Sequence, residues 1–205
     1  LAQMRRDDID GIKKSGVLRV LMSEAPQFNG LPRRMSPTDY ELTLLERFAE
    51  VKGLKLKIVQ EKNFYDLIPM LVAGKGDVIA DNMSITKDRL KQVNFSLPVG
   101  SSHDQIIVNA NAEGLKTLSD LKGRKVHVEK GTAYWRGANE VGAKMPKIEF
   151  VSPPAEVSTE ELMDQVGTGE IDACFTDSNY TESFMAYRPD VKIIHEFPKE
   201  DHTAW

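Results

Sequence analysis

The sequence predicts an α/β fold with two lobes, each built on a mostly parallel sheet flanked by helices. Strand-like and helix-like segments alternate along almost the whole chain, which is typical of parallel sheets. The polar link 109–114 has no apolar period and indicates a lobe boundary, with lobe 1 over 1–108. The length of 205 residues fits one large domain or two small lobes.

The elements of lobe 1 follow from local patterns. Acids open the first segment, lysines close it and Gly16 ends it, as in a short helix. Thr38 and Glu41 have the spacing of a capping box, so a helix should begin there and end at Gly53. We expect helices over 7–16, 38–53, 64–73 and 87–92, and strands over 17–22, 54–59, 77–80 and 105–108.

The second half of the chain repeats this alternation. Ser158 and Glu161 supply a second capping box, which predicts the start of a helix. We expect helices over 117–122, 132–142, 159–167 and 178–187, and strands over 124–128, 148–151, 171–175 and 191–196. The two halves share their element order, but no residue-level repeat relates them.

Composition excludes several classes of protein. The formal net charge is −4, from 27 basic and 31 acidic side chains, so a nucleic-acid partner is not expected. No apolar run is long enough to span a membrane. Cys174 is the single cysteine and lies in an apolar run, so it is expected to be a buried, inert thiol. The start at Leu1 fits a processed export signal or a trimmed chain.

Catalytic and metal-binding signatures are missing from the sequence. The common motifs of phosphate-binding loops, dinucleotide folds, zinc proteases and serine hydrolases do not occur. The four histidines lack the spacing of a metal site: His103, His127, His195 and His202. We therefore expect no catalytic residues, no metal and no cofactor in this chain.

Polar side chains follow the strand predicted over 77–80. Asp81, Asn82 and Ser84 come directly after it, and α/β sheets bind ligands at this carboxyl end. Arg89 is expected in the first turn of the next helix, where a cation gains nothing from the helix dipole. This position favours a ligand-facing guanidinium, although an ion pair with a surface acid explains such an arginine equally often.

Two further strands are followed by polar residues at a helix start. Thr132 follows the strand over 124–128, and Asp177 follows the strand over 171–175. Taken alone, Asp177 is better explained as a helix N-cap, which stabilises a helix by about 1 kcal/mol. The order of all these segments along the chain, however, favours a ligand-binding role for Asp177 over the N-cap explanation.

In this order the segments resemble the bacterial extracellular solute-binding proteins of family 3, which bind amino acids for ABC transporters. The matching stretches cover nearly the whole chain, at 16–20, 73–79, 83–86, Arg89, 94–96, 118–126, 129–132 and 169–173. Further stretches are similar to the amino-terminal regulatory domains of membrane-bound lytic murein transglycosylases, at 39–42, 87–91, 158–162, 189–191 and 203–205.

The resemblance implies a two-lobed periplasmic-binding-protein fold of type II, with a cleft that closes on an amino acid. It implies that Arg89 binds the ligand's carboxylate, with help from Ser84 and Thr132. It assigns the α-amino group to Asp177. This chemistry is sensible, because a planar guanidinium matches a carboxylate and an acid matches an ammonium.

The resemblance also implies contacts that decide ligand specificity. Asp81 and Asn82 occupy positions that usually touch the ligand, and with Glu24 they favour a polar or basic one. Phe28 is the candidate lid, although ordinary packing explains it equally well. The sequence Phe-Ser-Leu-Pro-Val over 95–99 lacks an acid and an aromatic that the family usually has.

The same resemblance sets the remaining expectations. Lobe 2 should cover 109–197, and 198–205 should start the return crossover to lobe 1, whose remainder is absent. The expected function is an extracytoplasmic binding domain for an amino acid or small peptide. It would belong to a lytic transglycosylase-like protein, with a fused catalytic domain, or to an ABC transporter receptor, with a permease as partner. The alternatives are the sensor domain of a membrane receptor and a dehydratase on the same fold. The expected location is periplasmic, with any membrane anchor outside this chain.

Overall fold

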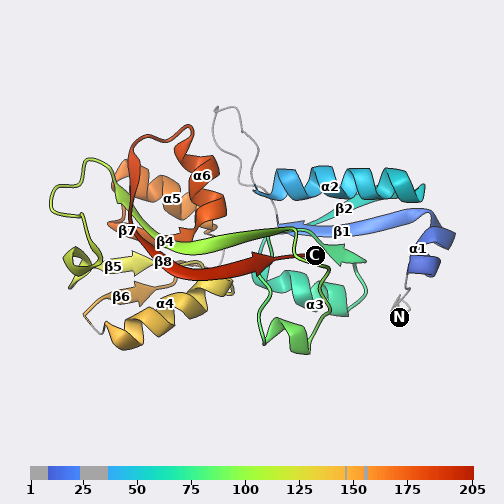
Figure 1. Ribbon diagram of the computed structural model, residues 1–205, viewed down its shortest axis with the longest axis horizontal. Helices are drawn as coiled ribbons and strands as arrows, with labels where there is room; N and C mark the ends of the chain where they lie inside the picture. Colours follow the sequence, from blue (N-terminus) through green and yellow to red (C-terminus); the bar gives the residue numbers. More distant parts are fainter. Residues whose placement is uncertain (1–8, 24–36, 146, 155–156) are drawn as a thin grey trace. The chain divides into compact units, whose positions relative to one another are not determined.

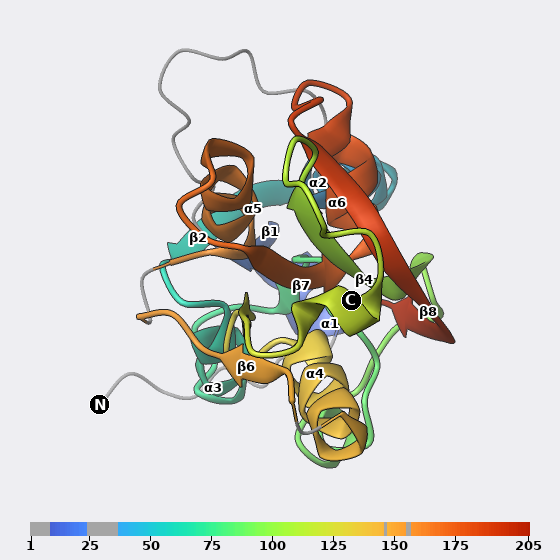
Figure 2. The same ribbon diagram turned by 90° about the vertical axis from the view of Figure 1, so that its left-hand side faces the viewer.

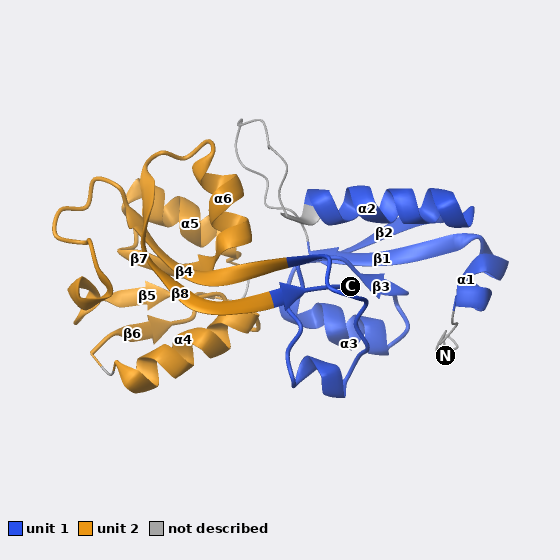
Figure 3. Cartoon of the chain, in the orientation of Figure 1, with its two compact units in different colours: residues 1–25, 35–100, 202–205 blue, residues 26–34, 101–201 orange. Residues whose placement is uncertain are grey.

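The computed structural model describes residues 9–23, 37–145, 147–154 and 157–205. Their contacts divide the described residues into two compact units (Figure 3). Unit 1 contains residues 9–23, 37–100 and 202–205, and unit 2 contains the described part of 101–201. The chain therefore passes from one unit to the other at 100/101 and 201/202, whereas the sequence predicts lobe limits at 108/109 and 197/198. The difference arises because the residues from Asp104 onward pair with a strand of unit 2.

Unit 1 contains a fully parallel sheet of three strands in the order β2-β1-β3 (Figure 1). The strands are β1 (Val17–Ser23), β2 (Lys55–Glu61) and β3 (Val78–Ile79). Its helices are α1 (Ile9–Ser15), α2 (Pro37–Lys52) and α3 (Leu67–Val72). Ser23 ends β1, and the segment that begins at Ala80 follows β3, so both lie at the carboxyl edge of the sheet.

Side chains of β1 point alternately to the two faces of this sheet, and helices cover both faces. Leu18, Val20 and Met22 pack in one cluster with Leu45 and Ala49 of α2. Leu21 belongs to a second cluster, with side chains of α3 and with Ile79 and Met83. Successive side chains of a strand point to opposite faces, so the central strand is buried from both sides.

Unit 2 contains most of a five-stranded sheet in the order β6-β5-β7-β4-β8. The strands are β4 (Gly100–Asn109), β5 (Lys125–His127), β6 (Glu149–Val151), β7 (Ala173–Asp177) and β8 (Val191–Thr203). The pairs β5-β6 and β5-β7 are parallel, and β4-β7 is antiparallel. The helices α4 (Ala133–Lys144), α5 (Thr159–Thr168) and α6 (Ser178–Met185) cover the sheet. Figure 2 shows α5 and α6 on one side and α4 on the other.

These two α/β units confirm the predicted fold class. Two segments that were expected to be helices are short 3₁₀ turns instead. The segment expected as a helix over 87–92 is a 3₁₀ turn over Arg89–Lys91, and that expected over 117–122 is a 3₁₀ turn over Leu118–Leu121. Segments this short form connectors, because nucleating an α-helix takes several residues. The last strand is longer than the expected 191–196, and its final residues, 202–203, belong to unit 1.

The two predicted capping boxes have different outcomes. The box at Ser158 and Glu161 is confirmed, with both reciprocal hydrogen bonds present. The prediction for 38–41 is wrong, because α2 begins at Pro37 and the Glu41 carboxylate accepts a hydrogen bond from Asn82 instead. A tertiary contact therefore replaced the local one.

Candidate functional site

The polar residues that follow β3 lie together at the carboxyl edge of the unit 1 sheet. Asp81, Asn82 and Ser84 are all buried. Ser23, the last residue of β1, donates from Oγ to Asp81 Oδ1 at 2.9 Å. Adjacent parallel strands end at the same edge, which is why residues 58 positions apart meet here. The sequence placed these side chains correctly at the strand end.

Arg89 lies in the same unit and is 8% exposed. Its Nη1 donates to the Ser84 carbonyl oxygen at 2.8 Å, and the guanidinium carbon lies 5.3 Å from the centre of the Phe64 ring. The backbone N–H of Arg89 also donates to Thr86 Oγ1. A surface ion pair was the competing explanation for this arginine. The guanidinium is buried and packs on an aromatic ring, so this arginine is not an exposed surface residue.

Asn82 has an unusual backbone conformation. Its φ of 50° makes it the one non-glycine residue with positive φ among those described. The Asn82 N–H donates to Glu41 Oε2 at 2.6 Å. Burial, and then the nearby charge of Asp81, raises the pKa of Glu41 to about 8 despite this hydrogen bond. Sequence reasoning missed Glu41 because its spacing from Thr38 matched a cap.

Thr132 begins the polar site of unit 2. It is the N-cap of α4, and its Oγ1 accepts from the Trp135 N–H at 3.2 Å. The same hydroxyl donates to the Glu129 carbonyl at 2.7 Å, which closes the turn between β5 and α4. The predicted site residue thus also organises a helix start.

Glu129 joins this turn to the start of α5. Its Oε2 accepts from the Thr159 N–H at 2.8 Å and from Thr159 Oγ1 at 2.5 Å. The Tyr134 hydroxyl also contacts Thr159 Oγ1. Burial raises the pKa of Glu129, although both bonds from Thr159 oppose that rise. The sequence gave no local signal for this cluster, because its members are 25 to 30 residues apart.

Asp177 ends β7 and is the N-cap of α6. Its Oδ1 accepts from the N–H groups of Asn179 and Tyr180, at 2.9 and 3.2 Å. The side chain is 3% exposed, and burial raises its pKa to about 6. The capping role therefore exists. It does not exclude a ligand contact, because a carboxylate accepts several hydrogen bonds.

Asp104 is a further carboxylate near Asp177. Burial and the charges of Asp201 and Asp177 raise its pKa to about 7. Asp104 Oδ2 lies so close to Gly137 of α4 that a Cβ at position 137 would require the Asp104 side chain to move. The sequence did not point to Asp104, because the strand predicted over 105–108 begins five residues after the observed start of β4 at Gly100.

The predicted site residues therefore fall into two groups. The structure brings Asp81, Asn82, Ser84 and Arg89 together in unit 1. Thr132 and Asp177 cap two helices of unit 2, and Tyr134 in the first turn of α4 is within electrostatic reach of Asp177. Glu24 and Phe28 lie outside the described residues.

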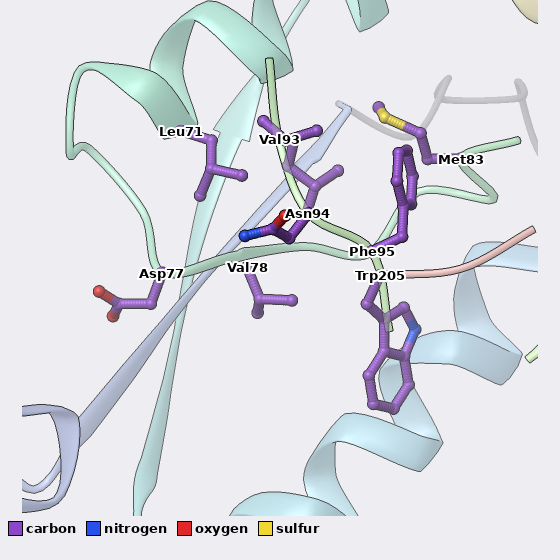
Figure 4. A pocket seen from close by; sticks show the side chains of 9 residues that line it. Leu71, Asp77, Val78, Met83, Val93, Asn94, Phe95 and Trp205 are labelled. Atoms are coloured by element: carbon purple, nitrogen blue, oxygen red, sulfur yellow. The ribbon is translucent and has the colours of Figure 1, made fainter. Parts of the chain in front are cut away.

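Unit 1 also has a pocket of about 160 Å³ that no predicted site residue lines. Figure 4 shows the rings of Phe95 and Trp205 on one side of it and Leu71 on the other. Val78 and Ile79 of β3 contribute to the lining. Mostly apolar side chains surround the pocket, so it differs in character from the polar strand ends.

Within the described ranges, no group of three or more histidine, cysteine or acidic residues could hold a metal ion. Among the same residues, no helix is long and apolar enough to cross a membrane. Cys174 is buried, and burial raises its pKa. The thiol is thus not a nucleophile of this site.

The family model of the bacterial extracellular solute-binding proteins, family 3, matches residues 18–147. The chain is also similar to the membrane-bound lytic murein transglycosylase F of Pseudomonas fluorescens strain Pf-5. The two sequences are 30% identical over 198 residues, which cover 96% of this chain and 40% of that protein. The chain therefore spans about two fifths of the length of this relative.

Two solved structures share the whole fold. The arginine-bound form of a truncated ArgBP from T. maritima matches with a TM-score of 0.77 and 31% identity. That match covers 96% of this chain and 90% of the other. An ancestral amino-acid-binding protein, described as a precursor of cyclohexadienyl dehydratase, matches with a TM-score of 0.74 and 28% identity. It covers 95% of this chain and 82% of the other.

Proposed function

Because the chain belongs to the bacterial extracellular solute-binding proteins of family 3, we propose that it is the amino-acid-binding part of a larger extracytoplasmic protein. The observation that carries this proposal is the buried Arg89 guanidinium, held by the Ser84 carbonyl at the end of β3. A buried arginine at a strand end matches the carboxylate that all amino acids and peptides share. Small peptides are included in the proposed ligand class.

We propose a role for each predicted site residue in binding the ligand. Its carboxylate would pair with Arg89, with Ser84 and Thr132 as further contacts, and its amino group would pair with Asp177. The buried acid Asp81, which follows β3 at the edge of the unit 1 sheet, favours a second positive charge on the ligand. A basic amino acid is therefore the first ligand to test. Arginine is bound in the T. maritima structure to which this chain is similar.

The direct test is titration calorimetry with L-arginine, after unfolding and refolding to remove bound ligand. Arg89→Ala should weaken binding by about 2–5 kcal/mol, because the ligand's carboxylate loses its partner. Arg124→Ala is the matched control, since Arg124 forms an exposed ion pair with Asp172. Unchanged affinity in Arg89→Ala would remove Arg89 from the site. A full panel of amino acids and small muropeptides would then identify or exclude other ligands.

We further propose that the parent protein is a lytic transglycosylase-like enzyme whose activity this domain regulates. The similarity over only two fifths of the relative's length supports a domain without the catalytic part. This chain alone should leave the turbidity of cell-wall sacculi unchanged, and a fall in turbidity would contradict the proposal. An ABC transporter receptor and a membrane sensor are the alternatives, and the gene sequence after Trp205 distinguishes them.

A dehydratase remains the second candidate function, because one matched structure is described as a precursor of such an enzyme. That activity requires an acid placed against a leaving hydroxyl group. Incubation with prephenate or arogenate separates the two functions, since formation of phenylpyruvate or phenylalanine would demonstrate the enzyme.

A further inference from the structure

Glu41 is an acidic residue in an unusual place. It lies on α2, whose other glutamates, Glu46 and Glu50, are exposed, yet Glu41 itself is 3% exposed. It is not part of the predicted capping box, because α2 begins at Pro37 and Thr38 lies inside the helix. A buried carboxyl group needs a specific partner to offset its loss of water. Its partner is the backbone of the proposed ligand site.

The segment that receives this contact is fixed from several sides. Asp81 accepts a hydrogen bond from Ser23 of β1. The Met83 carbonyl accepts from the Ala204 N–H at 3.0 Å, and Ser84 forms a bridge with Thr203. Asn82 lies between these anchors, and Glu41 holds its N–H at 2.6 Å. Residues 81 to 84 are therefore tied to three parts of unit 1: the end of β1, helix α2 and residues 203–204.

The backbone conformation of Asn82 explains why it needs the hydrogen bond to Glu41. A left-handed backbone is unfavourable for residues with a side chain, although asparagine tolerates it better than most. Its φ of 50° therefore needs compensation from outside the segment. The short hydrogen bond to Glu41 supplies it, since carboxyl oxygens are strong acceptors for backbone N–H groups.

We propose that Glu41 is a positioning residue of the ligand site: it holds the Asn82 backbone in its left-handed conformation and thereby sets the arrangement of Asp81, Asn82 and Ser84. Its effect on binding rests on the proposed function, whereas its hold on Asn82 does not. Glu41 itself touches no ligand in this proposal. Its influence passes through the backbone of residues 81–84.

The chemistry of the carboxyl group indicates which substitution preserves this role. Glu41 Oε2 accepts from Asn82, whereas Oε1 is buried without a hydrogen-bond partner among the described residues. Asp81 is the titratable group that faces Glu41 in the described part of the chain. Burial and this neighbour favour the protonated acid at neutral pH, in which one oxygen still accepts. Glutamine has the same shape and keeps that acceptor.

The binding test compares Glu41→Ala, Glu41→Gln and the control Glu46→Ala on the same helix. At pH 6.5, Glu41→Ala should bind L-arginine at least about ten-fold more weakly than the wild type, because the Asn82 N–H loses its acceptor. Glu41→Gln should restore the affinity to within about three-fold of the wild type, as should the control. Wild-type affinity in Glu41→Ala, or an equal loss in Glu41→Gln, overturns the proposal.

A second measurement keeps the proposal testable if Glu41→Ala does not fold. In nuclear magnetic resonance spectra, the Asn82 amide proton should shift as Glu41 ionises near pH 8 in the wild type. The shift should disappear in Glu41→Gln and persist in Glu46→Ala. If the chemical shift of the Asn82 amide proton does not change with pH in the wild type, the proposal that Glu41 holds Asn82 is wrong. If the wild type binds no amino acid, the proposed function fails, and this titration alone decides the role of Glu41.

Discussion

Asp104 of β4 and Asp177 of β7 are direct partners in an antiparallel strand pair. Paired residues on adjacent strands have side chains on the same face of the sheet, about 5 Å apart at Cβ. Two carboxylates therefore lie side by side in unit 2, and Asp201 adds a third negative charge nearby. Like charges in a partly buried place are unfavourable when all are ionised. We therefore expect the stability of the protein to depend on pH.

Replacing Asp104 by asparagine should stabilise the protein at high pH relative to the wild type. Burial and the charges of Asp201 and Asp177 raise the pKa of Asp104 from 3.8 to about 7 in the folded state. Between these values the folded state keeps a proton that the unfolded state releases. The wild type therefore loses stability as pH rises through this window. From pH 4 to pH 8, Asp104→Asn should gain about 1–3 kcal/mol over the wild type in urea unfolding.

Asp120 provides a control with the opposite sign. Hydrogen bonds from the N–H groups of Lys116 and Thr117 lower its pKa in the folded state. Its contribution is present above the unfolded pKa and is lost as pH falls, so Asp120→Asn should lose stability relative to the wild type as pH rises. If both variants show the same pH dependence, the pKa of Asp104 is not raised in the folded state.

Arginine affinity should fall in acid, because the proposed partner of the amino group must be ionised. Burial raises the pKa of Asp177 to about 6. The dissociation constant measured by calorimetry should increase about ten-fold for each pH unit below 6 and level off above 7. Asp177→Asn should bind weakly with a flat profile. A flat wild-type profile between pH 4.5 and 7 would show that Asp177 does not hold the ligand's charge.

Local patterns were enough to predict the α/β class and most of its elements. Capping chemistry marked the start of α5, and the alternation of apolar residues marked the strands. The same local reasoning misread Thr38 and Glu41, because a capping-box spacing also suits a glutamate that reaches a distant backbone N–H. Nothing near Glu41 in the sequence reveals that its carboxyl group accepts a hydrogen bond from the Asn82 N–H. Local patterns report local structure, and a contact over 41 residues depends on the fold.

The candidate site shows the same limit. Asp81, Ser84 and Arg89 are close in sequence, so their grouping in unit 1 could be expected from one strand end. The links of Asp104 to Asp177 and of Glu129 to Thr159 join different elements. These pairs depend on strand register and helix placement, which periodicity does not specify. Predicting the pair Asp104–Asp177 would have required knowing how β4 and β7 line up. In addition, the strand predicted over 105–108 did not include Asp104.

Glycine at position 82 should be better tolerated than alanine. Both variants lose the Asn82 side chain, but alanine pays a steric cost at a φ of 50° and glycine does not. Asn82→Gly should therefore be more stable than Asn82→Ala by about 1 kcal/mol in urea unfolding. At the exposed Glu46 of α2 the order should reverse, since glycine is the poorer residue inside a helix. The same order at both positions would contradict the left-handed conformation of Asn82.

Removing the Thr159 hydroxyl should destabilise unit 2 through two partners at once. Thr159 is buried, its Oγ1 donates to Glu129 Oε2 at 2.5 Å, and the Tyr134 hydroxyl contacts the same oxygen. Thr159→Val leaves both groups poorly satisfied in a buried place, so the free energy of unfolding should fall by about 2–3 kcal/mol. Thr168→Val, at the exposed end of the same helix, should change it by less than about 0.5 kcal/mol.

A double-mutant cycle measures how much of the stability lost in Thr159→Val comes from the contact with Tyr134. Tyr134→Phe removes the hydroxyl that needs Thr159, so the combined variant should cost less than the sum of the two single variants. We expect a coupling of about 1 kcal/mol, measured by urea unfolding of all four proteins. Additive costs would mean that the two hydroxyl groups act independently. The destabilisation by Thr159→Val would then come from Glu129 alone, whose carboxylate keeps only the Thr159 N–H of its two bonds from that residue.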